Sequence, residues 1–396
     1  MKIPQKEQDM QKKTPGENQE PNENSCIVFQ IPEKNKTPTK FDFINSIDIK
    51  PKKIAWLIHG LIALGSSTVL AGEPSIGKTT LSALLTSWII KGQSDFENIE
   101  VSIKGGVMWY SSEDAPDTIL IPRLSAAGVD ENQRKQIVFI KMKSLESPAK
   151  WLDNFFREVE QYYADHPDSN LRAIFIDPIH EFIDGDLNSA KDVATNMRKL
   201  AQFAQEKNLA IIGIHHFSKG TKDVRLIDRV TGSIQHVAKA RVVLGAVKHN
   251  GKSYFGIIKS NYDRINKSFE YEIVPHVQRY EGDENSYHTS KVVFKEYDEY
   301  RSLQDILDNV KPLSKPKIKQ IKNAEKLAQF VQENGGVLSN KELDQQVGQG
   351  KLFETPNALR SAKSCAVETG LLTVQRTDKA AYYEFPSINS IGDDDE

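Results

Sequence analysis

The segment from residue 72 to residue 79 constrains the fold of this chain more than any other. Its sequence, Gly-Glu-Pro-Ser-Ile-Gly-Lys-Thr, matches the phosphate-loop pattern G-x-x-x-x-G-K-[ST] at every defined position. The apolar run at residues 67–70 predicts a strand before the loop, and residues 80–88 predict a helix after it. Strand, loop and helix in this order are the context in which the pattern cradles a polyphosphate, because glycines let backbone N–H groups point inward and the helix N-terminus adds a favourable dipole.

The residue types within this loop predict ATP and Mg²⁺ as its ligands. We expect Lys78 to meet the β- and γ-phosphates and the Thr79 hydroxyl to ligate Mg²⁺. Ser75 stands close to where a further glycine is commoner, which stiffens the loop without breaking the pattern. The expected nucleotide-binding residues are Gly72, Glu73, Pro74, Ser75, Ile76, Gly77, Lys78, Thr79 and Thr80.

Composition limits the class of protein. A chain of 396 residues with 38% apolar content has room for one large and one small domain. The formal net charge of −2 excludes a global field that would draw the whole chain onto nucleic acid or a membrane, although a local basic surface is still allowed. Two distant cysteines, a polar N-terminal segment and the lack of an apolar run of ~18 residues predict a cytoplasmic protein without a membrane partner.

The pattern along residues 41–310 predicts an α/β domain with a mostly parallel sheet covered by helices. Asn250 and Gly251 lie between the last two strand candidates and predict a hairpin on the sheet edge. The strand candidates are residues 107–111, 137–141, 173–177, 210–215, 242–246 and 254–259.

Shifts in composition divide the rest of the chain. Residues 1–40 are polar and bear prolines, which predicts a disordered tail, with a short docking arm as the alternative. Residues 311–322 form a basic linker, residues 323–386 a second module, and residues 387–396 an acidic tail.

Three more strands are predicted to carry polar residues to the carboxyl edge of the sheet, where ligands bind in α/β folds. Asp177 ends a buried strand and is placed to complete the Mg²⁺ site. Glu113 is a candidate for the group that activates water, and the alternative is a helix-capping role for this acidic stretch through Asp114 or Asp117. His216 is a candidate for contacting the γ-phosphate or the attacking water, and the alternative is a structural histidine.

In this order the motifs resemble the RecA-like hexameric ATPases of the RepA type, the plasmid and phage replicative helicases, over roughly residues 52–275. The segments that carry the resemblance are residues 56–60, 111–114 with 122–124, 176–178, 216–219, 232–241 and 259–262. The resemblance implies a RecA-like P-loop ATPase core, a homo-oligomeric ring and single-stranded DNA as partner. It also implies that Arg241 and Lys259 reach the γ-phosphate of the neighbouring subunit. Arg123 departs from the family pattern, since it lies one residue too far from Glu113.

The connection over residues 217–233 is long and basic. In RecA-like rings such a loop faces the channel, so we expect phosphate contacts with single-stranded DNA that give affinity without sequence choice. The alternative is an ordinary solvated loop. The candidate DNA-binding residues are Lys219, Lys222, Arg225 and Arg229.

The C-terminal module reads as three helices and a hairpin, which resembles a winged helix. Its basic residues are candidates for contact with a DNA backbone or groove, and the alternative is a protein-docking or stabilising role. These residues are Arg360, Lys363, Arg376 and Lys379.

The predicted function is an ATP-hydrolysing DNA motor, a replicative helicase of the RepA type. The sequence leaves two alternatives open. One is a RecA-like ATPase that does not translocate and regulates replication or transcription. The other is a recombination-mediator ATPase that forms filaments.

Overall fold

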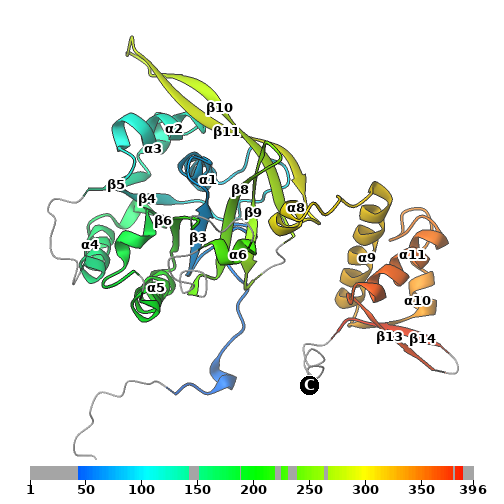
Figure 1. Cartoon of the computed structure of the whole chain (residues 1–396). Coiled ribbons are helices and arrows are strands. Elements are labelled where there is room, and N and C mark those ends of the chain that lie inside the picture. The colour runs from blue at the N-terminus through cyan, green and yellow to red at the C-terminus, as the bar shows by residue number, and fades with distance from the viewer. Residues whose placement is uncertain are drawn as a thin grey trace, which may run out of the picture. The chain divides into compact units, whose positions relative to one another are not determined.

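The computed structural model describes residues 43–141, 151–187, 189–218, 224–230, 239–262, 266–377 and 380–386. The largest sheet in these residues has nine strands in the order β11-β10-β9-β8-β3-β7-β6-β4-β5 (Figure 1). Its strands are β3 (Ser66–Gly72), β4 (Gly106–Ser111), β5 (Ile137–Ile140), β6 (Leu171–Asp177), β7 (Ala210–His216), β8 (Val242–His249), β9 (Lys252–Ser260), β10 (Ser268–Arg279) and β11 (Ser286–Asp298).

The strands from β8 to β5 are parallel, which confirms the predicted mostly parallel α/β sheet. Strands β3, β6 and β7 are almost wholly buried because helices cover both faces, and their near-continuous apolar sequences follow from this burial. The pairings Gly72 with His216 and Ser111 with Asp177 bring the carboxyl ends of neighbouring strands to one edge. This edge holds the candidate site.

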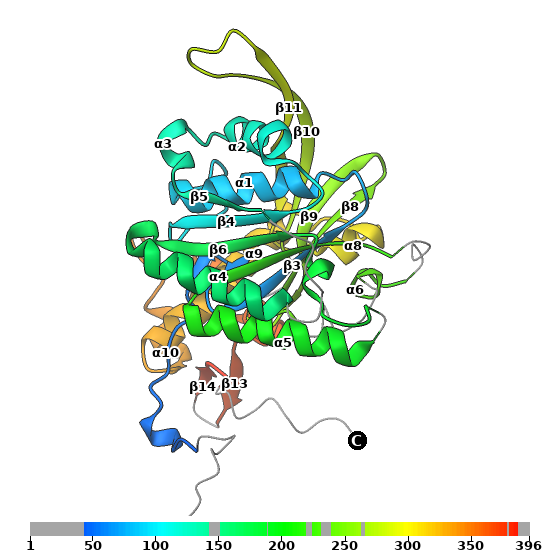
Figure 2. The same cartoon turned by 90° about the vertical axis from the view of Figure 1, so that its left-hand side faces the viewer.

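Two layers of helices cover the sheet (Figure 2). On one face α1 (Lys78–Lys91) packs its leucines and Trp88 against Trp109 and Phe175. The same side carries the π-helical turn η2 (Pro116–Leu120), α2 (Ile121–Ala126) and α3 (Glu131–Arg134). On the other face α4 (Trp151–Asp165) and α5 (Ala190–Lys207) bury Phe155, Met197 and Phe203 against β6 and β3.

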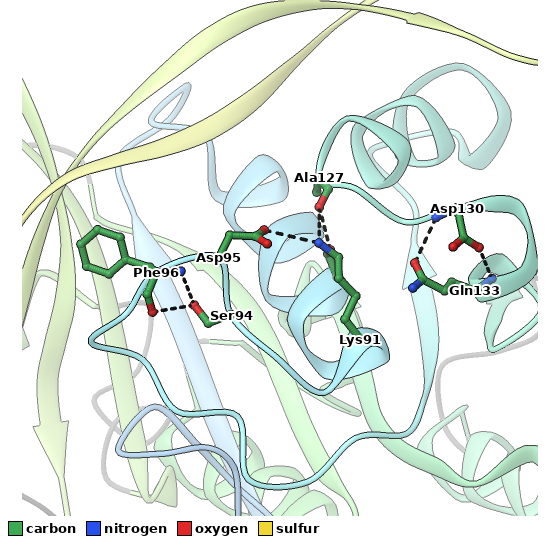
Figure 3. Close-up of polar contacts among 8 residues, drawn as sticks. Lys91, Ser94, Asp95, Phe96, Ala127, Asp130 and Gln133 are labelled. Atoms are coloured by element: carbon green, nitrogen blue, oxygen red, sulfur yellow. Dashed lines mark hydrogen bonds and ion pairs between the residues drawn. The ribbon is translucent and has the colours of Figure 1, made fainter.

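The C-terminal end of α1 is tied to the turn after α2 (Figure 3). Lys91 donates to the Asp95 carboxylate and to the Ala127 carbonyl, each at 3.3 Å. The Ser87 hydroxyl donates to the same carbonyl at 2.7 Å. These contacts hold the C-terminal end of α1 against the turn that follows α2.

The predicted β8–β9 hairpin is confirmed, with Asn250 and Gly251 at φ 49° and 79°. Two positive φ values are what a two-residue hairpin turn of type I′ requires. The hairpin is not on the sheet edge, however, because β10 and β11 extend the sheet beyond it (Figure 1). Helix α8 (Leu303–Leu307) follows and buries Leu303 and Ile306 in the core.

The C-terminal module has its own core and a three-stranded sheet of order β12-β14-β13. Helix α9 begins at Lys315 rather than near residue 323, since Pro316 in the first turn pre-sets the helical backbone within the basic stretch. The elements are α9 (Lys315–Glu333), β12 (Val337–Ser339), α10 (Asn340–Asp344), α11 (Pro356–Glu368), β13 (Thr373–Arg376) and β14 (Ala381–Glu384). Their order agrees with the predicted helices and hairpin, and DNA binding by this module stays a prediction.

The remaining elements are short. A hairpin of β1 (Trp56–Ile58) and β2 (Ile62–Ala63) leads into β3. Residues 43–53 fall in a separate unit and contain one 3-10 turn, η1 (Ser46–Asp48). Three further short helices are η4 (Pro167–Ser169), η5 (Ile179–Phe182) and α6 (Leu226–Arg229). In the described part of the chain, every helix is too short or too polar to cross a membrane.

Candidate nucleotide-binding site

The phosphate loop joins the carboxyl end of β3 to the N-terminus of α1, as predicted. Gly77 caps α1 at φ 89°, in the left-handed region that favours glycine. Gly72 is required for a different reason, because a Cβ there would lie 2.8 Å from the Ala246 carbonyl oxygen. Ser75 also has a positive φ, 60°, where the sequence lacks the commoner glycine.

Lys78 is buried within this loop and connects it to β7. Its ammonium donates to the carbonyls of Gly72 and Glu73 at 3.3 and 3.0 Å. It also lies 3.1 Å from Nδ1 of His216. Burial lowers the pKa of Lys78, while Asp177 and Glu113 act in the opposite direction.

His216 links the lysine to the acidic side of the site. Burial and the neighbouring Lys78 lower the pKa of His216, so its neutral form accepts from the ammonium at Nδ1. In that tautomer the proton is on Nε2, which lies 3.6 Å from the Glu113 carboxylate. The structure thus brings together Lys78, His216 and Glu113, which the sequence separates widely.

Asp177 lies at the carboxyl end of β6 and is 1% exposed. The Thr79 hydroxyl donates to its Oδ2 at 3.4 Å, and within the described residues Oδ1 has no hydrogen-bond partner. Burial raises the pKa of Asp177 to about 7, with further contributions from Glu113 and Asp114. A hydroxyl, an orphaned carboxylate oxygen and excess negative charge fit a hard cation such as Mg²⁺, so the predicted metal residues Thr79 and Asp177 suit that group.

Glu113 is half-exposed beyond the end of β4, on the same edge as Asp177. The next residue, Asp114, forms an ion pair of 2.9 Å with Arg123 on α2. The N-cap of the helical segment that follows is Ala115, so neither Asp114 nor Asp117 is the N-cap, although the Asp117 carboxylate accepts from the Thr118 N–H at 2.8 Å in the first turn. Arg123 therefore positions the segment that carries Glu113.

Arg241 and Lys259 lie at the amino edge of the sheet, where the parallel strands begin, opposite the carboxyl edge that holds the phosphate loop. The Arg241 N–H donates to the Ser67 carbonyl at the beginning of β3, whereas the phosphate loop begins at Gly72. Five residues of strand separate these positions, or about 17 Å at ~3.3 Å per residue. Lys259 donates to the Ala240 carbonyl at 3.0 Å, on the same side as Arg241.

The predicted DNA-binding residues are only partly described. Arg225 is the N-cap of α6 and Arg229 is its last residue, while Lys219 and Lys222 lie outside the described residues, as do residues 232 and 233. Arg225 is 79% exposed and pairs with Asp228 at 3.0 Å. The Ser218 N–H donates to the Arg229 carbonyl at 2.8 Å, so α6 returns to the end of β7.

One basic residue of the C-terminal module is not available to DNA. Lys363 is buried and donates to Asn340 and Asp344 at 2.7 and 2.9 Å. Arg360 and Arg376 are exposed, whereas Lys379 lies outside the described residues.

Sequence reasoning missed a contact between the phosphate loop and β10. The Tyr271 hydroxyl donates to the Ile76 carbonyl at 2.8 Å across a sequence separation of 195 residues. Tyr271 belongs to no sequence motif. It reaches the phosphate loop because β10 pairs with β9.

Comparison with known proteins adds a family and several folds. Residues 32–222 match the AAA_25 family, described as an AAA domain. No curated protein matches the chain. One similar solved structure is the RadB recombinase, which is 16% identical over 54% of this chain and 89% of that chain (TM-score 0.39). Another is a KaiC-like protein from the hyperthermophilic archaeon Pyrococcus horikoshii, which is 18% identical over 56% of this chain and 95% of that chain (TM-score 0.39). A DnaB-like replicative helicase, solved with its interactions with primase, is 12% identical over 53% of this chain and 55% of that chain (TM-score 0.41).

The strand order agrees with the family match. One strand, β7, separates the phosphate-loop strand β3 from the Asp177 strand β6, as in RecA-like ATPases. The residues that the pattern requires converge at the carboxyl edge of this sheet. The part of the chain built on this sheet therefore has the RecA-like P-loop ATPase fold, and residues 32–222 are similar to the AAA_25 family.

Proposed function

We propose that this chain is an ATP-driven DNA motor, a replicative helicase of the RepA type that acts on single-stranded DNA in plasmid or phage replication. The observation that carries the proposal is the position of Arg241 and Lys259 at the edge of the sheet opposite the phosphate loop. Neither cation reaches the phosphate loop of its own subunit. Their distance from it supports the proposal that they complete the site of a neighbouring subunit, as in a ring of identical subunits.

The residues at the carboxyl edge divide the work of hydrolysis. Lys78 and the loop N–H groups bind the phosphates, and Thr79 with Asp177 would hold Mg²⁺, which neutralises charge that develops on the phosphates. Glu113 orients and deprotonates the attacking water. His216, which contacts both Lys78 and Glu113, links the state of the phosphates to β7 and the loop that follows it.

The loop after β7 is the proposed DNA contact. Lys219, Lys222, Arg225 and Arg229 supply four cations close in sequence to His216. Phosphate contacts of this kind bind single strands of any sequence. His216 would change its contacts with the nucleotide state and so alter the conformation of this loop, which would couple hydrolysis to movement along DNA.

A regulatory ATPase that does not translocate is the second candidate. The observation that favours it is a C-terminal module with its own core and exposed arginines, Arg360 and Arg376. Such a module is suited to bind duplex DNA independently of the ATPase domain. Duplex binding by this module without single-strand stimulation of the ATPase would support this candidate.

Mixing two inactive variants tests the shared site. Arg241→Ala should bind ATP but lose roughly 10³-fold in turnover, the scale of trans-acting arginines. Lys78→Ala should lose both binding and turnover. A mixture should regain activity, because one subunit contributes Arg241 and the other the intact phosphate loop. A mixture that stays inactive while labelled subunits demonstrably exchange would contradict action in trans.

A further inference from the structure

The phosphate loop is held from outside by β10, a strand far away in sequence. Tyr271 is buried, and its hydroxyl donates to the Ile76 carbonyl at 2.8 Å. Burial raises the pKa of Tyr271, and the nearby Glu73 raises it further, so the hydroxyl keeps its proton and remains a donor. The contact joins the loop to a strand paired with both β9 and β11.

The peptide that accepts this bond also carries the Gly77 N–H. A trans peptide is planar, so the carbonyl of Ile76 and the N–H of Gly77 point in opposite directions. Because Tyr271 holds the carbonyl toward β10, the Gly77 N–H points away from β10. Phosphate loops bind through N–H groups turned inward, and Gly77 immediately precedes Lys78 at the start of α1.

A second β10 residue restricts the same peptide. A Cβ on Gly77 would lie 1.8 Å from Cδ1 of Ile273, so the Ile273 side chain packs directly on the glycine backbone. Gly77 has a φ of 89° and no side chain, so its backbone could also adopt conformations that other residues rarely reach. Ile273 blocks part of that freedom by occupying the adjacent space.

We propose that Tyr271 is a positioning residue for nucleotide binding, which fixes the Ile76–Gly77 peptide so that the Gly77 N–H faces the bound phosphates. The inference rests on the proposed binding of ATP at this loop. It adds a role that belongs to none of the sequence motifs. Tyr271 does not touch the nucleotide itself. It affects nucleotide binding by orienting the single peptide group between Ile76 and Gly77.

Tyr271→Phe removes the hydroxyl and keeps the ring. Without the bond, the peptide has more freedom to rotate, and part of the binding free energy is used to fix its orientation. We expect ADP and a non-hydrolysable ATP analogue to bind about 3- to 10-fold more weakly to the full chain, the range that one net hydrogen bond supplies. The KM for ATP should rise by a similar factor with kcat little changed, because the N–H contact is equal in ground and transition states.

A matched control separates positioning from stability. Tyr163 on α4 donates to the Leu171 carbonyl at 2.9 Å, at the amino end of β6 and away from the loop. Tyr163→Phe should lower the Tm of the chain about as much as Tyr271→Phe, while its Kd for ADP stays that of the wild type. Ile273→Ala is a second test on a partly exposed residue, and it should also weaken ADP binding.

The outcomes distinguish this inference from the proposed function. Weaker ADP binding by Tyr271→Phe and Ile273→Ala, but not by Tyr163→Phe, supports the positioning role. Wild-type affinity in both β10 variants, in a chain where Lys78→Ala abolishes binding, overturns the positioning role and leaves ATP binding intact. A wild-type chain that binds no nucleotide overturns both.

Discussion

The raised pKa of Asp177 makes the stability of the protein depend on pH, so the electrostatics of the site can be tested by measuring stability. The carboxyl is 1% exposed and faces Glu113 and Asp114, and its pKa is raised to about 7 by burial first and then by these two neighbours. The ordinary value is 3.8. The folded, metal-free chain therefore binds this proton about 3 pH units more tightly than the unfolded chain does.

The sign of the pH dependence follows from linkage. Because the folded state holds the extra proton, the contribution of Asp177 to the free energy of unfolding falls as pH rises from about 4 to about 7. Above that window the accumulated loss is about 4 kcal/mol, at 1.36 kcal/mol per unit. Asp177→Asn keeps the shape and the acceptor for Thr79 but carries no charge. The variant should therefore be more stable than the wild type at pH 8, by up to about 4 kcal/mol, and about equal to it at pH 4.

Urea denaturation in EDTA at pH 4, 6 and 8 measures this difference. All four tryptophans precede residue 152, so their fluorescence reports on the ATPase domain rather than on the C-terminal module. Asp95→Asn is the control, since Asp95 is largely exposed and its charge is screened by solvent. Mg²⁺ with ADP should reverse the order at pH 8, because only the wild type gains the metal contact. A variant that is less stable than the wild type at pH 8 in EDTA would refute the reasoning.

Two further predictions concern hydrolysis and DNA. Glu113→Gln should keep its affinity for ADP and lose ~10²-fold or more in turnover, because Glu113 acts on the water rather than on the phosphates; near-normal turnover in a single-turnover assay would assign the base elsewhere. Replacement of Lys219, Lys222, Arg225 and Arg229 by Ala should flatten the log–log salt slope of single-strand binding by about 0.7 per lost contact and leave basal hydrolysis nearly unchanged. An unchanged slope in filter binding would exclude this loop as the DNA contact.

The central site could be predicted from sequence because its signals are local. Apolar runs identify buried parallel strands, and polar residues at their carboxyl ends share an edge by the geometry of the sheet. This reasoning was enough to place Asp177 and Glu113 at that edge, and in the structure Asp177 contacts Thr79 while Glu113 lies near Lys78 and His216. The mutual contacts of His216 with Lys78 and Glu113 needed coordinates, since they depend on side-chain direction.

The β10–β11 hairpin could not be predicted in the same way. Within the described residues, its two strands pair only with each other beyond Tyr271, and many of their side chains are partly exposed. Their sequences therefore mix charged, polar and apolar residues without the continuous apolar run of a buried strand. Lys363 is a similar case, because its burial depends on Asn340 and Asp344 from another helix.

The length of β3 constrains how subunits would assemble if Arg241 acts in trans. The phosphate loop and Arg241 lie at opposite edges of one sheet, about 17 Å apart along the strand. A contact that joins the two brings the carboxyl edge of one subunit to the amino edge of the next, which is a head-to-tail arrangement. Such contacts repeat around a ring when the rotation closes and along a filament when it does not. The proposed helicase and a filament-forming mediator thus share this site geometry, and the rotation between neighbouring subunits decides between them.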